Sequence, residues 1–255
     1  MAPDLPPLHD ELTFLAPLSE QRAAGLVTWL TTELDSGTVL DIGCGWGELL
    51  LRIAEAAPSC QAVGVDTDES SLQEARRRAS ARGLSDRVSF LAGDGEHVGP
   101  AVVDALVCIG ATQVWGPPVE AGQPLDYDSA LDAIRGRVPD GGRVVYADGI
   151  WSRPPTPEAT AQLGGRDDEL VTLDVLCSLA EEAGFEVASA DEATMEEWDV
   201  FEAGFTARYD TWLAHHSPGH PDAASVRERA ARQRASYVDG YRGVLGMGYL
   251  QLLAV

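Results

Sequence analysis

The sequence predicts an α/β fold built on a doubly wound parallel sheet. Short apolar stretches alternate with amphipathic ones as far as Ala190, which is the order expected of strands joined by crossover helices. The first strand runs into a glycine-rich turn, and acidic residues or glycines follow several later strands. Ligands of such sheets bind beyond the carboxyl ends of the strands. The fold class therefore also predicts where the functional site lies.

Residues 39–47 carry the clearest motif, V-L-D-I-G-C-G-W-G. Val39–Ile42 are predicted to form a short buried strand in which only Asp41 is polar, and an apolar helical pattern covers residues 48–57. Glycines let the backbone approach a ligand closely and adopt positive φ. The new helix offers free backbone N–H groups at the same place. The stretch is typical of a nucleotide-binding turn.

Two other nucleotide loops fit this stretch less well. The dinucleotide fingerprint G-x-G-x-x-G needs a glycine where this chain has Glu48. A phosphate-binding Walker loop needs a lysine, and the chain contains none. Asp41 would also repel a pyrophosphate, so the pattern favours a cationic ligand.

The other elements follow in order along the chain. Strands are predicted at 61–66, 88–91, 101–109, 143–147, 185–190 and 246–255, and helices at 19–34, 70–82, 127–138 and 172–184, with a loop at 116–123. Five strand ends then converge on one rim of the sheet: Gly43, Asp66, Asp94, Gly110 and Asp148. Asp66 comes 19 residues after Gly47, the distance at which an acidic residue closing the second strand meets a ribose diol.

The chain is predicted to be one domain with an arm and an insertion. Residues 1–18 contain four prolines and form the arm, 19–190 and 246–255 form the core, and 191–245 form the insertion. Aromatic residues recur in the insertion at helical spacing, on one face of a helix: Trp198, Phe201, Phe205, Tyr209 and Trp212. Most of this stripe is expected to pack on the core. A helical pair at this position is also a natural lid over a small-molecule pocket.

Composition excludes several classes of function. The formal net charge of −23 repels phosphate backbones, so nucleic acid is not expected as the main substrate. No apolar run is long enough to cross a membrane, and the N-terminus lacks a signal-peptide pattern. The four cysteines are scattered without metal-binding spacing. We therefore expect a cytoplasmic protein that binds no metal, as a monomer or homodimer.

Residues 39–47 resemble motif I of the class I S-adenosylmethionine-dependent methyltransferases, whose usual form is V-L-D-x-G-C-G-x-G. The Pro-Asp-Gly-Gly turn at 139–142 also resembles that family. The resemblance covers about 19–190 and the last strand. It implies a Rossmann-like sheet of seven strands, with the seventh antiparallel between the fifth and sixth, and S-adenosylmethionine as cofactor.

The resemblance also implies a role for each residue along the rim. Asp41 and the carbonyl groups near Ile109 would hold the ammonium end of the cofactor, and Asp66, with Thr67 beside it, would meet the ribose. Asp94 and Gly95 would meet the adenine. The predicted cofactor-binding residues are Asp41, Gly43, Cys44, Gly45, Gly47, Asp66, Thr67, Asp94, Gly95, Ile109 and Gly110.

The residues that bind the acceptor and the general base are less sharply indicated. Aromatic faces near a sulfonium could stabilise its charge through cation–π contact. The predicted substrate-binding residues are Gln113, Trp115, Trp151, Trp198 and Tyr209. A base is needed only if the acceptor arrives protonated, and the candidates are His9, Asp148 and Glu169. His215, His216 and His220 are interpreted as an exposed loop.

These observations together predict an enzyme that transfers a methyl group from S-adenosylmethionine to O, N or C of a small acceptor by in-line displacement. The alternatives are a protein or RNA methyltransferase and a cofactor-binding regulatory protein without transfer activity. A nicotinamide dehydrogenase is disfavoured by Asp41 and Glu48.

Overall fold

The computed structural model describes residues 4–34, 36–116 and 124–255. These residues form two compact units. The core unit comprises Ser19–Ile150, Asp168–Glu192 and Met247–Val255, and the helical unit comprises Met1–Leu18, Trp151–Asp167 and Ala193–Gly246. Most of the loop predicted at 116–123 lies outside the described residues.

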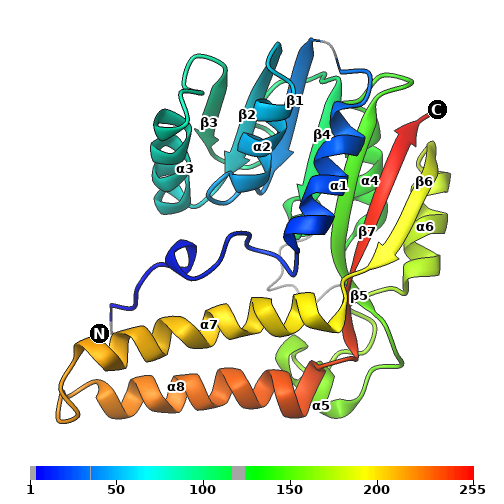
Figure 1. Ribbon diagram of the computed structural model, residues 1–255. Coiled ribbons are helices and arrows are strands. Elements are labelled where there is room, and N and C mark those ends of the chain that lie inside the picture. The colour runs from blue at the N-terminus through cyan, green and yellow to red at the C-terminus, as the bar shows by residue number, and fades with distance from the viewer. Residues whose placement is uncertain (1–3, 35, 117–123) are drawn as a thin grey trace. The chain divides into compact units, whose positions relative to one another are not determined.

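The sheet has the predicted seven-stranded topology. Its order is β3-β2-β1-β4-β5-β7-β6. Its strands are β1 (Gly37–Ile42), β2 (Cys60–Asp66), β3 (Val88–Ala92), β4 (Ala105–Ile109), β5 (Arg143–Trp151), β6 (Phe185–Glu192) and β7 (Leu245–Ala254). The pairs among β1 to β5 are parallel, and β7 runs antiparallel to β6. Figure 1 shows β7 in red between β5 and β6. The predicted fold class is confirmed.

Handedness places the core helices in two layers. The core helices are α1 (Glu20–Thr31), α2 (Glu48–Ala56), α3 (Glu69–Ala81), α4 (Tyr127–Arg135) and α6 (Leu173–Glu182). The chain steps from β1 outward through β2 to β3, but from β4 to β5 in the opposite direction. Because crossovers are right-handed, α2 and α3 cover one face of the sheet and α4 covers the other. Strand order reverses between β1 and β4, where doubly wound sheets bind ligands.

Two strand boundaries differ from the prediction by four residues, and the others differ by at most two. β4 begins at Ala105 instead of residue 101, and Val102 is 65% exposed. The chain enters this strand through Asp104, whose Oδ2 accepts the Thr38 N–H at 2.7 Å. β5 continues to Trp151 instead of ending at residue 147. The buried side chains of Ile150 and Trp151 explain the extension, because burial outweighs the weak strand propensity of the Asp-Gly pair before them.

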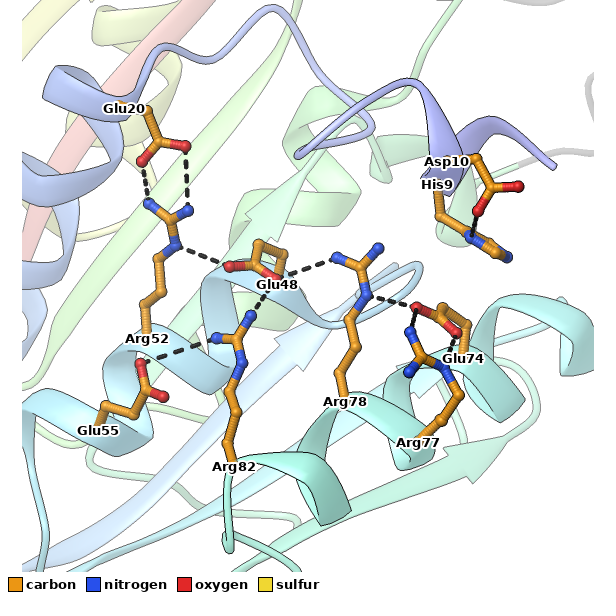
Figure 2. A network of polar contacts seen from close by, with 10 residues as sticks. All are labelled: His9, Asp10, Glu20, Glu48, Arg52, Glu55, Glu74, Arg77, Arg78 and Arg82. Atoms are coloured by element: carbon orange, nitrogen blue, oxygen red, sulfur yellow. Dashed lines mark hydrogen bonds and ion pairs between the residues drawn. The ribbon is translucent and has the colours of Figure 1, made fainter. Parts of the chain in front are cut away.

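A buried ion network joins α1, α2 and α3 (Figure 2). Glu48, the first residue of α2, is 6% exposed. Its carboxylate meets Arg52 Nε at 2.9 Å and Arg78 Nη1 at 3.0 Å. Arg82 Nη2 lies 2.6 Å from the same carboxylate. Arg78 also bonds to Glu74 on α3, and Arg52 bonds to Glu20 on α1. The helix that follows the glycine turn is thus tied to both of its neighbours.

The helical unit has a small core of its own. It contains η1 (Leu8–Asp10), α5 (Pro157–Thr160), η4 (Ala161–Leu163), α7 (Met195–His215), α8 (Ala223–Ala235) and the π-helix η5 (Ser236–Tyr241). A capping box of Thr194 and Glu197 starts α7. Tyr209 and Trp212 pack with Val226 of α8. Leu12 of the arm lies against Gly204, where a methyl group would overlap its side chain.

Candidate active site

The turn between β1 and α2 requires its glycines. Gly43, Gly45 and Gly47 have φ of 73°, 52° and 71°, in the left-handed region that other residues rarely adopt. A Cβ on Gly43 would lie 2.6 Å from Ala111 Cβ, and one on Gly47 would lie 2.6 Å from the Phe90 ring. The turn is therefore held tightly against its neighbours, with backbone instead of side chains at its surface.

Asp66 stands at the end of β2 and faces this turn. Its Oδ2 accepts the Gly45 N–H at 2.7 Å, and its Oδ1 accepts the Asp68 N–H at 2.9 Å. A carboxylate can accept about four hydrogen bonds, so each oxygen keeps capacity for a hydroxyl donor. Thr67 next to it is exposed. The position suits recognition of a diol, and that role stays a prediction.

Asp41 is the most unusual group at the rim. It is 5% exposed, and no described residue donates a hydrogen bond to its carboxylate. Burial, and then the nearby charge of Asp66, raise its pKa well above the ordinary value. An unpaired buried carboxylate is costly, and a cationic ligand would relieve that cost. Cys44 beside it is half-buried, and burial followed by Asp41 and Asp66 raises the pKa of its thiol.

The end of β3 contributes an acidic residue and a buried glycine. Asp94 is exposed, and its Oδ1 accepts the Glu96 N–H at 3.0 Å. Gly95 is buried, and a Cβ there would lie 2.5 Å from Ile42 Cγ2. Gly95 thus keeps its backbone close to the end of β1. Both residues lie at the rim, where the sequence predicted them.

The turn after β4 completes the rim. Ile109 is half-buried, and Gly110 is exposed with φ of 66°. Gln113, in the short helix η2 (Thr112–Val114), donates from Nε2 to the Gly110 carbonyl at 3.2 Å. Trp115 is 3% exposed, and its indole N–H has no hydrogen-bond partner among the described residues.

Asp148 lies beside this turn, inside β5. It is 7% exposed. Its Oδ2 accepts the Thr112 N–H at 2.9 Å, and its Oδ1 accepts the Gly149 N–H at 2.7 Å. Burial raises its pKa, although hydrogen bonds from Thr112 and Gly149 oppose that shift. Burial also raises the pKa of Tyr146, whose hydroxyl bonds to that of Thr112.

The remaining predicted residues are divided between the two units. Glu169 belongs to the core unit, and its carbonyl accepts the Leu125 N–H at 3.3 Å. His9, Trp151, Trp198 and Tyr209 belong to the helical unit. His9 Nδ1 lies 3.3 Å from Asp10 (Figure 2), and the Trp151 indole donates to the Asp167 carbonyl at 2.9 Å. The roles of these residues stay predictions.

Metal-binding groups are sparse in the part of the chain that the structure describes. Within residues 4–34, 36–116 and 124–255, only Asp94, Glu96 and His97 bring three possible ligand atoms together, and all three residues are exposed. In the helical unit the His216 ring stacks on Trp212 at 3.8 Å, with His220 edge-on to both. That arrangement is a packed turn.

Comparison with known proteins agrees with this geometry. Residues 39–122 match the methyltransferase domain family. The uncharacterized protein YjhP of Escherichia coli K12 is 28% identical over 93% of this chain and 92% of its own length. A SAM-dependent methyltransferase from Thiobacillus denitrificans, solved with S-adenosylhomocysteine, is 25% identical, with a TM-score of 0.79 over 97% of this chain and 96% of that one.

These matches support an S-adenosylmethionine-dependent methyltransferase with the class I fold. The methyltransferase also shares its fold with a SAM-dependent methyltransferase from Geobacter sulfurreducens. That structure has a TM-score of 0.81 at 23% identity, over 97% of this chain and 96% of that one.

Further curated methyltransferases match the chain over shorter stretches. They include enzymes named for RNA and for protein substrates, and the chain spans only 16% to 64% of their lengths. None of the helices in the described parts of the methyltransferase has the length and apolar composition needed to span a bilayer.

Sequence reasoning missed several residues that shape the site. Thr112 and Tyr146 bond across β4 and β5, and Glu48 gathers three arginines. The only local signal was the i,i+4 pair of Glu48 and Arg52 in α2. Arg78 and Arg82 lie 30 and 34 positions from Glu48, and Tyr146 lies 34 positions from Thr112, so no short motif reveals these contacts.

Proposed function

We propose that the methyltransferase moves a methyl group from S-adenosylmethionine to O, N or C of a small-molecule acceptor. The match to a methyltransferase domain and the similar structure solved with S-adenosylhomocysteine support S-adenosylmethionine as the donor. The acceptor class rests on the charge of the chain and on the insertion. A monomeric or homodimeric state and a cytoplasmic location remain predictions from the sequence.

The buried, unpaired carboxylate of Asp41 carries the proposal for the donor site. Asp41 lies in β1 immediately before the glycine turn, and no described residue balances its charge. The ammonium group of a methionine moiety supplies the missing cation. Gly43, Gly45 and Gly47 leave room for that moiety, and Asp66 has acceptor capacity for two ribose hydroxyls. The residues present therefore fit the donor.

The chemistry asks for orientation more than for bond-making side chains. The methyl carbon of the sulfonium is already electrophilic, so an acceptor held in line with the carbon–sulfur bond can react directly. Proximity and orientation can contribute on the order of 7–11 kcal/mol. Here the glycine turn and the turn at 110–115 would orient the donor. A general base acts only on a protonated acceptor, with His9, Asp148 and Glu169 as candidates.

Charge supports a small acceptor over nucleic acid. At a net charge of −23, long-range repulsion disfavours a phosphate backbone. The arginines of α8, Arg227, Arg229, Arg232 and Arg234, are the one local exception. Arg232 pairs with Glu228 at 2.9 Å, and Arg227 and Arg234 are exposed, as expected of a solvated face.

The helical insertion is proposed to act on the acceptor side, as a lid. Its support is that α7 and α8 pack on each other and hold a buried polar cluster. Glu202 is 6% exposed and accepts bonds from Tyr241 at 2.6 Å and Gln233 at 2.9 Å. Trp198, edge-on to Tyr241, keeps its indole N–H without a described partner. Trp198→Ala is expected to raise the KM of the acceptor and leave the Kd of S-adenosylhomocysteine unchanged.

Calorimetric titration tests the donor site first. The wild type is titrated with S-adenosylmethionine, S-adenosylhomocysteine and NAD, beside the variants Asp66→Asn and Asp68→Asn. The amide introduced by Asp66→Asn would present a donor to the ribose where an acceptor is needed, so affinity should fall about tenfold, ~1.4 kcal/mol. In the Asp68→Asn variant the new side chain can still cap α3, as Asp68 does now, so this variant should bind normally. Binding of NAD alone would contradict the proposal.

Acceptor class is tested with purified enzyme and labelled donor. Small metabolite acceptors, ribosomal RNA and a ribosomal protein extract are offered in parallel. Transfer to small acceptors supports the proposal. Transfer to RNA or protein alone would overturn it, and donor binding with no transfer to any acceptor would favour a regulatory protein.

A further inference from the structure

The turn after β4 is held by the neighbouring strand more than by its own residues. Gly110 extends the β4–β5 ladder, because its N–H donates to the Ala147 carbonyl at 2.7 Å. Thr112 then opens η2, and the first N–H groups of a helix have no partner within it. Ala111 occupies the N-cap position and makes no side-chain capping bond. The cap must come from elsewhere.

Asp148 of β5 supplies that cap. Its Oδ2 accepts the Thr112 N–H at 2.9 Å, across 36 positions of sequence. Its other oxygen accepts the Gly149 N–H at 2.7 Å, which fixes the orientation of the carboxylate. The Thr112 hydroxyl bonds in turn to Tyr146 on the same strand, and both of these side chains are buried. Two residues of β5, Asp148 and Tyr146, thus each form a hydrogen bond with Thr112, the first residue of η2.

The carboxylate of Asp148 is retained at a cost. It is 7% exposed, and no described arginine or histidine pairs with it. Burying an unpaired charge is unfavourable unless hydrogen bonds offset the loss of water. Apart from the bond to its own neighbour Gly149, those bonds come from Thr112. The Asp148 carboxylate therefore stabilises the turn at 110–115.

The position of the turn at 110–115 sets its distance from the glycine turn that begins at Gly43. A Cβ added to Gly43 would lie 2.6 Å from Ala111 Cβ. Ala111 is thus packed against the first glycine of the motif, directly before the residue that Asp148 caps. A shift of Thr112 would move Ala111 and change the gap between the two turns.

We propose that Asp148 is a positioning residue, which caps η2 and thereby fixes the turn 110–115 against the glycine turn for binding of the donor. This role rests on the proposed function, in which the methionine part of the donor lies between the two turns. It differs from the role of general base considered for Asp148 from the sequence, because it acts on binding of the donor and of its product alike.

Binding of S-adenosylhomocysteine separates the two roles, because binding needs no proton transfer. Asp148→Ala should weaken the Kd at least tenfold. Asp148→Asn keeps one acceptor oxygen for Thr112 and should weaken it less. The matched control is Asp104→Asn. Asp104 accepts a backbone N–H, that of Thr38, in the same way but at the opposite end of the strands, and this variant should bind like the wild type.

Hydrogen exchange of the amides at 110–115 provides a readout without the ligand. Asp148→Ala should speed their exchange, and Asp104→Asn should not. An unchanged Kd together with unchanged exchange in the Asp148 variants overturns the proposal. If the wild type binds neither donor nor product, the proposed function fails, and exchange at 110–115 still decides the positioning role. Should Asp148→Ala fail to fold, Asp148→Asn carries the same comparisons.

Discussion

At the scale of single residues, the site keeps two carboxylates where their charge is costly. Asp41 and Asp148 are both buried, and no cation balances either of them within the described residues. Asp148 is offset by two backbone N–H groups, whereas Asp41 has no such bond. Strain of this kind gathers at functional sites and is compensated elsewhere in the fold. We therefore expect Asp41 to lower the stability of the fold and to strengthen binding of the donor.

We expect Asp41→Asn to stabilise the fold and to weaken binding of the donor. Removing an unpaired buried charge should raise the free energy of unfolding by roughly 1–3 kcal/mol. Loss of the carboxylate that faces the ammonium group should raise the Kd of S-adenosylmethionine about tenfold. Thermal unfolding and calorimetry of the same preparation measure both effects. A variant that is less stable and binds normally would contradict this view of Asp41.

The stability difference should depend on pH. Burial raises the pKa of Asp41 in the folded protein, above the ~3.9 of an unfolded chain. Between these two values the folded protein binds more protons than the unfolded chain, so its stability falls as pH rises. The amide that replaces the carboxylate in Asp41→Asn does not titrate. The excess Tm of Asp41→Asn over wild type should grow from pH 4 towards pH 7, and a constant excess would argue against it.

At the scale of elements, the network around Glu48 fixes the helix that follows the glycine turn. Burial raises the pKa of Glu48, but hydrogen bonds from Arg82 and Arg52 outweigh burial and leave it lowered. Its contribution is therefore present above the unfolded pKa of ~4.3 and is lost as pH falls through the lower folded value. Removing one partner of a buried ion pair costs up to 3–5 kcal/mol.

Glu48→Gln should lower the free energy of unfolding by about 2 kcal/mol at pH 7, below that upper value because the arginines are partly exposed. The loss should shrink below about pH 4, where the wild-type carboxylate is protonated too. Glu55→Gln is the control, because Glu55 is 47% exposed and lies 3.7 Å from Arg82. Exposed pairs contribute less than about 1 kcal/mol. Urea unfolding at pH 7 and pH 3.5 measures both variants. Equal losses in the two would refute a special role for Glu48.

Two helix glycines make a matched pair in different environments. Gly204 of α7 is buried against Leu12 of the arm, whereas Gly25 of α1 has nothing within 4 Å of an added Cβ. Gly25→Ala should stabilise by about 0.5–1 kcal/mol, because alanine favours helix. Gly204→Ala should destabilise by roughly 1–2 kcal/mol, because overpacking exceeds that gain. Thermal unfolding measures both changes, and proteolysis near residues 8–14 should speed up only in Gly204→Ala. If both substitutions stabilise the protein, Leu12 is not packed in a fixed position against Gly204.

At the scale of the whole molecule, the sequence predicts local order better than contact. The strands and the acidic residues and glycines at their ends were predicted because apolar runs and glycines are local signals. The start of β4 was wrong because Ala101 and Val102 are apolar yet exposed, and a run of letters does not show which side faces water. The hydrogen bond from the Thr112 N–H to Asp148 joins residues 36 positions apart, so only the folded sheet reveals it.

The charge of the whole chain leads to a prediction about salt. S-adenosylmethionine carries a net positive charge near neutral pH, and S-adenosylhomocysteine has lost the sulfonium and is neutral overall. A protein of net charge −23 should attract the first more than the second, and dissolved ions screen that attraction beyond ~10 Å at about 0.1 M. Raising NaCl from ~0.02 to ~0.5 M should therefore weaken binding of the donor several-fold and binding of the product less. Calorimetry of both ligands across this range measures the difference. Parallel salt dependence for donor and product would mean that local contacts alone, such as the one assigned to Asp41, set the affinity.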